Sequence, residues 1–213
     1  MNRIAAAACL LILVVLPACG PRELAPDSPI DCERCAEWNE PLDPFRIHGN
    51  TWYVGTDGLS SILIETGDGL VLIDGGLPQS AALIETSIRE LGFDPHDIGA
   101  ILLSHPHYDH AGGINALQRM TGASVYTGEA GLETLTSGRL QEGDPQFVAD
   151  TDDGRFPAVR KVLTAGNGER LVFGDEDVTG DLVGEQETER IAVANDVDTE
   201  DACVVAGGQR LGL

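Results

Sequence analysis

The chain has 213 residues, enough for one domain with a substantial core, and its hydrophobic fraction of 42% is that of an ordinary globular protein. Its formal net charge is −22. A chain this acidic repels phosphate backbones and anionic lipid headgroups, so composition excludes nucleic acid as a partner.

Residues 1–18 have the pattern of an export signal. Arg3 precedes the apolar run Ile4–Leu16, and small residues follow in "LPACG". The run is too short to span a bilayer, which predicts a signal peptide and an exported, periplasmic or envelope-anchored protein. The segment before Cys19 resembles a lipoprotein box, so Cys19 is the candidate for lipidation and for a lipid anchor to the membrane; simple cleavage nearby is the alternative.

Residues 19–44 are rich in Pro, Asp and Glu and show little periodicity, which predicts a tether or an irregular lead-in. Cys32 and Cys35 form a CxxC pair within it. In a cytosolic protein such a pair would suggest zinc or redox chemistry, but in an exported chain it favours a local disulfide.

From residue 45 onwards, apolar runs alternate with helical periodicity. The pattern predicts strands over 51–56, 60–66, 70–76, 98–104 and 123–128, and helices over 79–92, 112–122 and 129–139. Alternating strands and helices indicate an α/β (α+β) fold, with helices packed on a mixed sheet. We therefore expect one domain over 45–178, followed by an atypical acidic tail over 179–213 in which only two short strands are suggested.

The segment 101–113, "ILLSHPHYDHAGG", carries the chemistry. Four potential metal ligands fall within it: His105, His107, Asp109 and His110. Pro106 disfavours helix, so we expect an extended or looped segment, in which residues two apart point the same way. The spacing predicts His105 and His107 on one ion and Asp109 and His110 on a neighbour, the alternative being surface histidines of a loop. These ligands suit Zn²⁺, with Mn²⁺ or Fe²⁺ as alternatives.

At these residues the chain resembles a known family. "SHPHYDHAGG" matches the HxHxDH metal motif of the metallo-β-lactamase superfamily. Upstream, "EWNEPLDPFRIHGNTWYVGTDGLSSILIETGDGLVLIDGG" resembles the class B β-lactamases of the third subclass. "SGRLQEGDPQF" and "FPAVRKV" are similar to that subclass too, so the resemblance runs from about Glu37 to Val178.

The resemblance implies an αββα sandwich of two similar halves with a two-zinc site at one edge. It implies His105 and His107 on the first zinc, and Asp109 and His110 on the second. Asp109 would also orient a zinc hydroxide that opens a β-lactam ring, and Asp74 would support the ligands without binding metal. Another hydrolase of the superfamily, acting on a lactone or thioester, and a non-catalytic metal-binding lipoprotein are the alternatives.

The resemblance also has a gap. The family's third ligand to each zinc is a histidine from the second half, and no histidine follows His110. We therefore expect the N-terminal half of the sandwich to be present and the C-terminal half to be largely missing. Either the chain is a truncated or frame-shifted, inactive product, or tail carboxylates such as Asp175 or Asp181 replace the ligands. His48 and His96 are not expected to do so.

Overall fold

A computed structural model describes residues 21–149, 151–166, 169–174, 176–181, 190–194 and 202–206, and describes side chains only up to Gly174. The helices are α1 (Cys35–Trp38), α2 (Ala81–Glu90), α3 (Tyr108–Ala111), α4 (Ile114–Thr121) and α5 (Gly131–Ser137), with single 3₁₀ turns at Pro78–Ser80 and Pro95–Asp97. The strands are β1 (Phe45–His48), β2 (Thr51–Tyr53), β3 (Ile62–Thr66), β4 (Gly69–Ile73), β5 (Ile98–Leu102), β6 (Ser124–Thr127), β7 (Val162–Thr164), β8 (Arg170–Phe173), β9 (Glu176–Asp181), β10 (Arg190–Ala194) and β11 (Ala202–Ala206).

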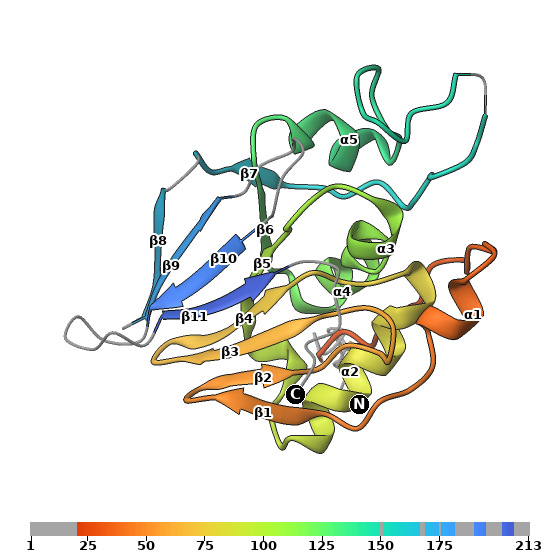
Figure 1. Ribbon diagram of the computed structural model, residues 1–213. Helices are drawn as coiled ribbons and strands as arrows, with labels where there is room; N and C mark the ends of the chain where they lie inside the picture. The colour runs from red at the N-terminus through yellow and green to blue at the C-terminus, as the bar shows by residue number, and fades with distance from the viewer. Residues whose placement is uncertain are drawn as a thin grey trace, which may run out of the picture.

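Two sheets form the framework (Figure 1). The larger has the order β1-β2-β3-β4-β5-β6-β7 and the smaller the order β11-β10-β9-β8. Strands β1 to β4 pair antiparallel, whereas β4 to β7 pair parallel. The predicted hairpin is present as β3 and β4, joined at the Gly-Asp-Gly turn. The carboxyl ends of β4, β5 and β6 consequently meet at one edge of the sheet, where sites of α/β folds lie.

The larger sheet is buried on both faces. Leu63, Leu72 and Ile101 point to the side covered by α2 and α4, and their neighbours Ile64 and Ile73 point to the other side. Because successive strand residues alternate between faces, the unbroken apolar runs of the sequence supply both surfaces at once.

The second face of the larger sheet is covered as well. Its buried residues, among them Ile64 and Leu102, are at most 9% exposed, and Leu171 and Phe173 of β8 pack against them. The described residues thus form a helix layer and two sheet layers. No helix follows residue 138 in the described part of the chain.

Helices α2 and α4 end just before the glycines that close their predicted ranges. Gly122 ends α4 in the left-handed conformation with φ +78°, which glycine adopts without strain. Gly92 has φ +89° just after α2. Helix α2 buries Ile84 and Ile88, and α4 buries Ile114 and Leu117, so the face predicted from helical periodicity is the one that meets the sheet.

The N-terminal segment before α1 is irregular, as predicted, yet it is docked on the domain. Asp27 accepts from the guanidinium of Arg119 on α4 at 2.9 Å. Gln79 binds both backbone polar groups of Ile30, at 3.0 and 3.2 Å. It is therefore a packed lead-in rather than a free tether.

The predicted disulfide is present between Cys32 and Cys35, and Cys35 is buried at 3% exposure. The predicted signal peptide and Cys19 lie outside the described residues, as does Asp175, and the side chain of Asp181 is not described. No described helix has the length and apolar character needed to cross a membrane.

Candidate metal centre

The site lies at the carboxyl edge of the parallel strands. Asp74 directly follows β4, and Ser104 follows β5 after one residue. Strands β4 and β5 are hydrogen-bonded parallel neighbours, so these two side chains emerge side by side. The motif then continues from Ser104 into α3, so its ligands also lie at this edge.

The motif begins extended and ends helical. His107 has φ −94° and ψ 156°, which is extended backbone, and it precedes α3. The amides of His110 and Ala111 then both donate to the carbonyl of His107, closing one helical turn. The expectation of a wholly non-helical segment is therefore wrong for residues 108–111, because the effect of Pro106 reaches back to His105 and not forward beyond the next residue.

Three potential donors converge. One ligand atom each of His105, His107 and Asp109 lies within 4.8 Å of the others. The rings of His105 and His107 are 4.7 Å apart between centroids. The turn of α3 brings Asp109 toward the two extended histidines, so it belongs to their cluster and not only to a pair with His110. Imidazole nitrogens and a carboxylate oxygen are donors that suit Zn²⁺.

His110 is the most buried member of the motif, at 5% exposure. Its ring centroid is 4.0 Å from that of His105, and its Nε2 is 3.8 Å from Oδ2 of Asp109. All four predicted residues are therefore neighbours.

Burial, followed by the charge of Asp109, raises the pKa of the Tyr108 phenol, so this side chain is neutral at physiological pH.

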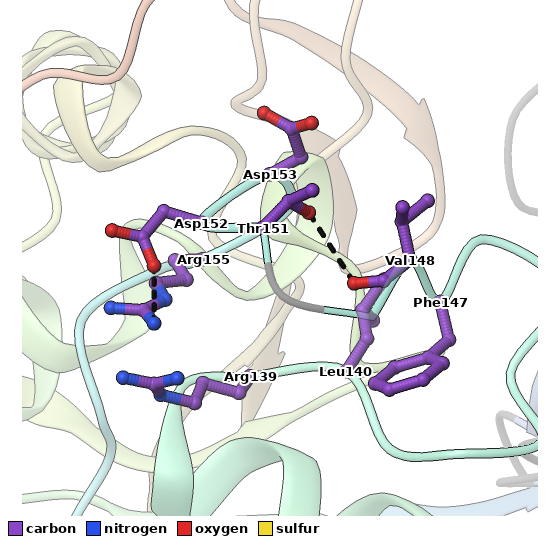
Figure 2. Close-up of a pocket in the computed structure, with 8 residues that line it drawn as sticks. All are labelled: Arg139, Leu140, Phe147, Val148, Thr151, Asp152, Asp153 and Arg155. Atoms are coloured by element: carbon purple, nitrogen blue, oxygen red, sulfur yellow. Dashed lines mark hydrogen bonds and ion pairs between the residues drawn. The ribbon is translucent and has the colours of Figure 1, made fainter.

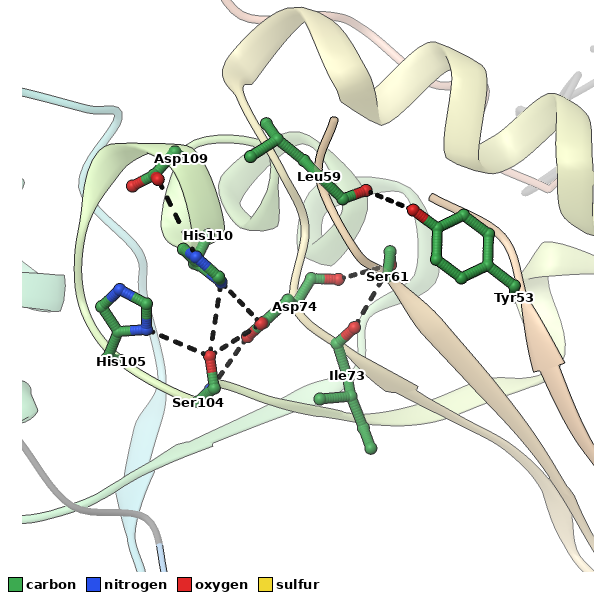
Figure 3. Close-up of polar contacts among 9 residues, drawn as sticks. All are labelled: Tyr53, Leu59, Ser61, Ile73, Asp74, Ser104, His105, Asp109 and His110. Atoms are coloured by element: carbon green, nitrogen blue, oxygen red, sulfur yellow. Dashed lines mark hydrogen bonds and ion pairs between the residues drawn. The ribbon is translucent and has the colours of Figure 1, made fainter. Parts of the chain in front are cut away.

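Asp74 organises the floor of the site (Figure 3). Its Oδ1 accepts from the backbone amide of Ser104 at 2.8 Å, and its Oδ2 accepts from the Ser104 hydroxyl at 2.7 Å. His110 Nδ1 is 2.8 Å from the same Oδ2. The Ser104 hydroxyl also lies 3.3 Å from His105 Nδ1. A carboxylate that holds one ring nitrogen leaves the other, Nε2 of His110, for a metal.

The backbone segments around Asp74 and around His110 lie in close contact beneath the site. Gly75 N donates to the carbonyl of His110 at 2.8 Å, and Gly113 N donates to that of Gly76 at 3.1 Å. A Cβ on Gly113 would lie 2.2 Å from the carbonyl oxygen of Gly75. Asp74 itself has φ +61°, a conformation that costs a non-glycine residue free energy. Its hydrogen bonds to Ser104 and His110 hold it there.

Asp144, which sequence reasoning missed, also reaches the motif. Its Oδ2 lies 2.9 Å from Nε2 of His107, and the two side chains are 19% and 15% exposed. Asp144 is in the irregular segment between α5 and β7, and no periodic pattern marks it. The only available cue was that "GDPQF" belongs to a segment similar to the third subclass.

The same segment forms a cavity of about 390 Å³ (Figure 2). Its lining includes the exposed Phe147 and Val148 and two cations, Arg139 and Arg155. Arg155 is paired with Asp152. None of the four motif residues lines this cavity.

The chain's other two histidines are not at the site. His48 is on β1 and exposed. His96 Nδ1 contacts Asp94 at 2.8 Å, and its Nε2 contacts the Arg22 carbonyl at 2.8 Å. These hydrogen bonds, the one to Arg22 first, raise the pKa of His96. The prediction that neither residue completes the metal site agrees with these positions.

Similar solved structures include metallo-beta-lactamases, among them enzymes described as B3. A B3 enzyme described as the first with an active-site glutamic acid is 42% identical, with a TM-score of 0.73 over 84% of this chain and 66% of that chain. Rm3 metallo-beta-lactamase is 36% identical, with a TM-score of 0.71 over 83% and 65%. BJP-1, a subclass B3 enzyme of Bradyrhizobium japonicum, is 31% identical, with a TM-score of 0.67 over 81% and 64%.

Curated relatives match over shorter stretches. Exodeoxyribonuclease WalJ of Streptococcus pneumoniae is 32% identical over 40% of this chain and 30% of its own length. An N-acyl homoserine lactonase of Bacillus cereus is 32% identical over 25% of this chain and 31% of its own length. The chain thus spans under a third of these relatives and just under two thirds of the first solved structure.

The model of one family, described as the metallo-beta-lactamase superfamily, matches residues 54–196. The match includes Asp74 and the whole His105–His110 motif, and it extends into the first part of the predicted acidic tail. Sequence motif, layered fold and site geometry agree with it, and the chain belongs to the metallo-beta-lactamase superfamily.

Proposed function

We propose that this protein is a zinc-dependent hydrolase that opens the ring of β-lactams. The observation that carries the proposal is the cluster of His105, His107 and Asp109 at the strand edge. Identity of 42% to a B3 metallo-beta-lactamase over 84% of the chain supports the substrate class.

The four motif residues are proposed to hold two ions. His105 and His107 supply ring nitrogens to the first. Asp109 is close both to this pair and to His110, and its carboxylate and His110 Nε2 serve the second. When bound, such ions lower the pKa of coordinated water toward 7 and polarise a carbonyl oxygen.

The protein's own contribution is orientation. Asp74 fixes His110 through Nδ1 and holds the Ser104 hydroxyl beside His105. Asp109 is the candidate catalytic residue, because an anionic oxygen beside the metal ligands can accept a hydrogen bond from the attacking water and aim its lone pair. Burial of Asp74 and His110, each with a side chain 6% exposed, prevents water from competing for these hydrogen bonds.

The direct test measures metal content and turnover of the full chain. We expect bound zinc by elemental analysis and hydrolysis of a chromogenic cephalosporin. Asp109→Ala should lose hydrolysis and bind less zinc, whereas Asp153→Ala, at an exposed aspartate outside the motif, should keep both. Zinc binding without turnover would support a non-catalytic metal-binding protein instead. A chain that binds no zinc and hydrolyses nothing would contradict the proposal.

Lactone hydrolysis is the second candidate, and the similarity to an N-acyl homoserine lactonase favours it. Both substrates present a carbonyl within a ring, so the same metal-ligand set serves either. Parallel assays with a carbapenem and an acyl-homoserine lactone separate the two. A kcat/KM at least tenfold higher for the lactone would replace the β-lactam assignment.

We also propose export with a lipid on Cys19, from the signal-like run and the box before it. Expression of the full chain in a Gram-negative host is expected to place it in the membrane fraction. The Cys19→Ser variant should no longer be found in the membrane fraction. An unchanged distribution would contradict the lipid anchor.

A further inference from the structure

One ring nitrogen of His107 is held by a carboxylate from a distant segment. Asp144 is separated from His107 by 37 residues, yet its Oδ2 is 2.9 Å from His107 Nε2. Both side chains are more than four-fifths buried. The contact is therefore a built tertiary feature and not an encounter between two exposed charges.

The backbone around Asp144 fixes this carboxylate in place. The amide of Asp144 donates to the Gln141 carbonyl at 3.1 Å, and the Phe147 amide donates to the Asp144 carbonyl at 2.9 Å. Its Oδ1 accepts from the amide of Gln146 at 2.8 Å. One carboxylate oxygen thus anchors the turn, and the other is left for His107.

The contact with Asp144 determines which nitrogen of His107 carries the proton. A neutral ring carries one proton, and an Nε2–H that donates to Asp144 leaves the lone pair on Nδ1. Histidines that bind metals commonly donate their second nitrogen to a carboxylate, which fixes the ring's orientation and tautomer. The nearby Asp74–His110 pair has the same arrangement with the two nitrogens exchanged.

We infer that Asp144 is a positioning residue of the metal centre: by holding His107 through Nε2, it leaves Nδ1 as the nitrogen available to the ion that His105 would also bind. This inference rests on the proposed metal site. It also links the segment 141–147 to the centre, because the conformation of that turn sets where the carboxylate lies.

The tautomer of His107 tests the inference without any metal. At about pH 8.5, where imidazoles are neutral, ¹⁵N NMR of the metal-free chain should show His107 protonated at Nε2. Asp144→Ala should give a mixture of tautomers, whereas Asp144→Asn, which keeps an acceptor oxygen, should restore part of the Nε2–H population. An unchanged His107 spectrum in Asp144→Ala would overturn the inference.

Metal affinity provides the second measurement. In competition with a chelator, Asp144→Ala of the full chain should bind Zn²⁺ about 10- to 100-fold more weakly than wild type. Asp144→Asn should lose less, and the matched control Asp153→Ala should be unchanged. Equal affinity in wild type and Asp144→Ala would overturn the positioning role. If wild type itself binds no Zn²⁺, the proposed function fails, and the tautomer measurement still decides whether Asp144 orients His107.

Discussion

Two carboxylate–histidine pairs flank the motif, and they differ in how they are built. Asp74–His110 joins the ends of neighbouring elements, with both side chains 6% exposed. Asp144–His107 joins the motif to an irregular segment, with side chains 19% and 15% exposed. Each contact leaves one ring nitrogen for a metal. In His110 the remaining nitrogen is Nε2, and in His107 it is Nδ1.

The two pairs differ in what they contribute: Asp74 stabilises the fold, whereas Asp144 mainly orients a metal ligand. Asp74 also accepts two hydrogen bonds from Ser104, so it holds β4, β5 and α3 together as well as a ligand. Asp144 shares its other oxygen only with its own turn. We therefore expect changes at Asp74 to affect folding first, and changes at Asp144 to affect mainly metal binding.

The largest effect is expected for Asp74→Ala. It leaves buried donors of Ser104 and His110 without an acceptor, so the free energy of unfolding should fall by about 3–5 kcal/mol. For Asp144→Ala the loss should be about 1 kcal/mol, because water can replace the carboxylate. Urea denaturation of the metal-free chain measures both. An equal loss in the two variants would erase the contrast between the pairs.

Gly113→Ala tests the close packing beneath the buried pair. The added Cβ would lie 2.2 Å from the Gly75 carbonyl oxygen, and backbone cannot yield cheaply, so we expect a loss of about 3 kcal/mol. Gly99→Ala is the matched control, because nothing lies within 4 Å of its added Cβ. The control should stay within about 1 kcal/mol of wild type in thermal and urea unfolding. Wild-type stability in Gly113→Ala would contradict this packing.

Zinc binding should raise the free energy of unfolding, and the size of the increase should depend on the ligand Asp109 and on the Asp144–His107 pair. At a free concentration 100 times its Kd, a ligand specific to the folded state raises the free energy of unfolding by about 2.7 kcal/mol. We expect this gain in wild type and a smaller gain at equal zinc in both Asp144→Ala and Asp109→Ala. Thermal melts with zinc and with excess chelator measure it. A full gain in Asp109→Ala would remove that carboxylate from the metal site.

The smallest effect concerns the third such pair, Asp94–His96, which is remote from the motif and more exposed. The Arg22 carbonyl and Asp94 raise the pKa of His96 above its ordinary value of about 6.5, so the folded state favours the protonated ring. Its contribution to stability is therefore complete below about pH 6.5 and is lost as pH rises through the raised native pKa.

Histidine NMR titration should give a native pKa above 6.5 for His96. His96→Asn should flatten the dependence of stability on pH in that window, and proteolysis of the segment around Arg22 should become faster at high pH in wild type only. A native pKa at or below the ordinary value would contradict the contact with Arg22.

Much of the domain could be predicted locally. Continuous apolar runs predicted β3, β4 and β5, because strands buried on both faces are apolar throughout. Helical periodicity with Gly92 and Gly122 predicted α2 and α4, because a left-handed helix end favours glycine. The motif and its resemblance predicted the family. The helical turn of α3 was missed, because a single turn has too few residues to show a period.

The amino-acid sequence by itself therefore determined the family, the main elements, the local disulfide and the four candidate ligands. Tertiary structure alone decided that Asp144 reaches His107, that Asp109 joins the cluster of His105 and His107, and that the lead-in docks on Arg119. The physical reason is range: periodicity and capping act over a few residues, whereas these contacts depend on where the sheet places segments far apart in the chain.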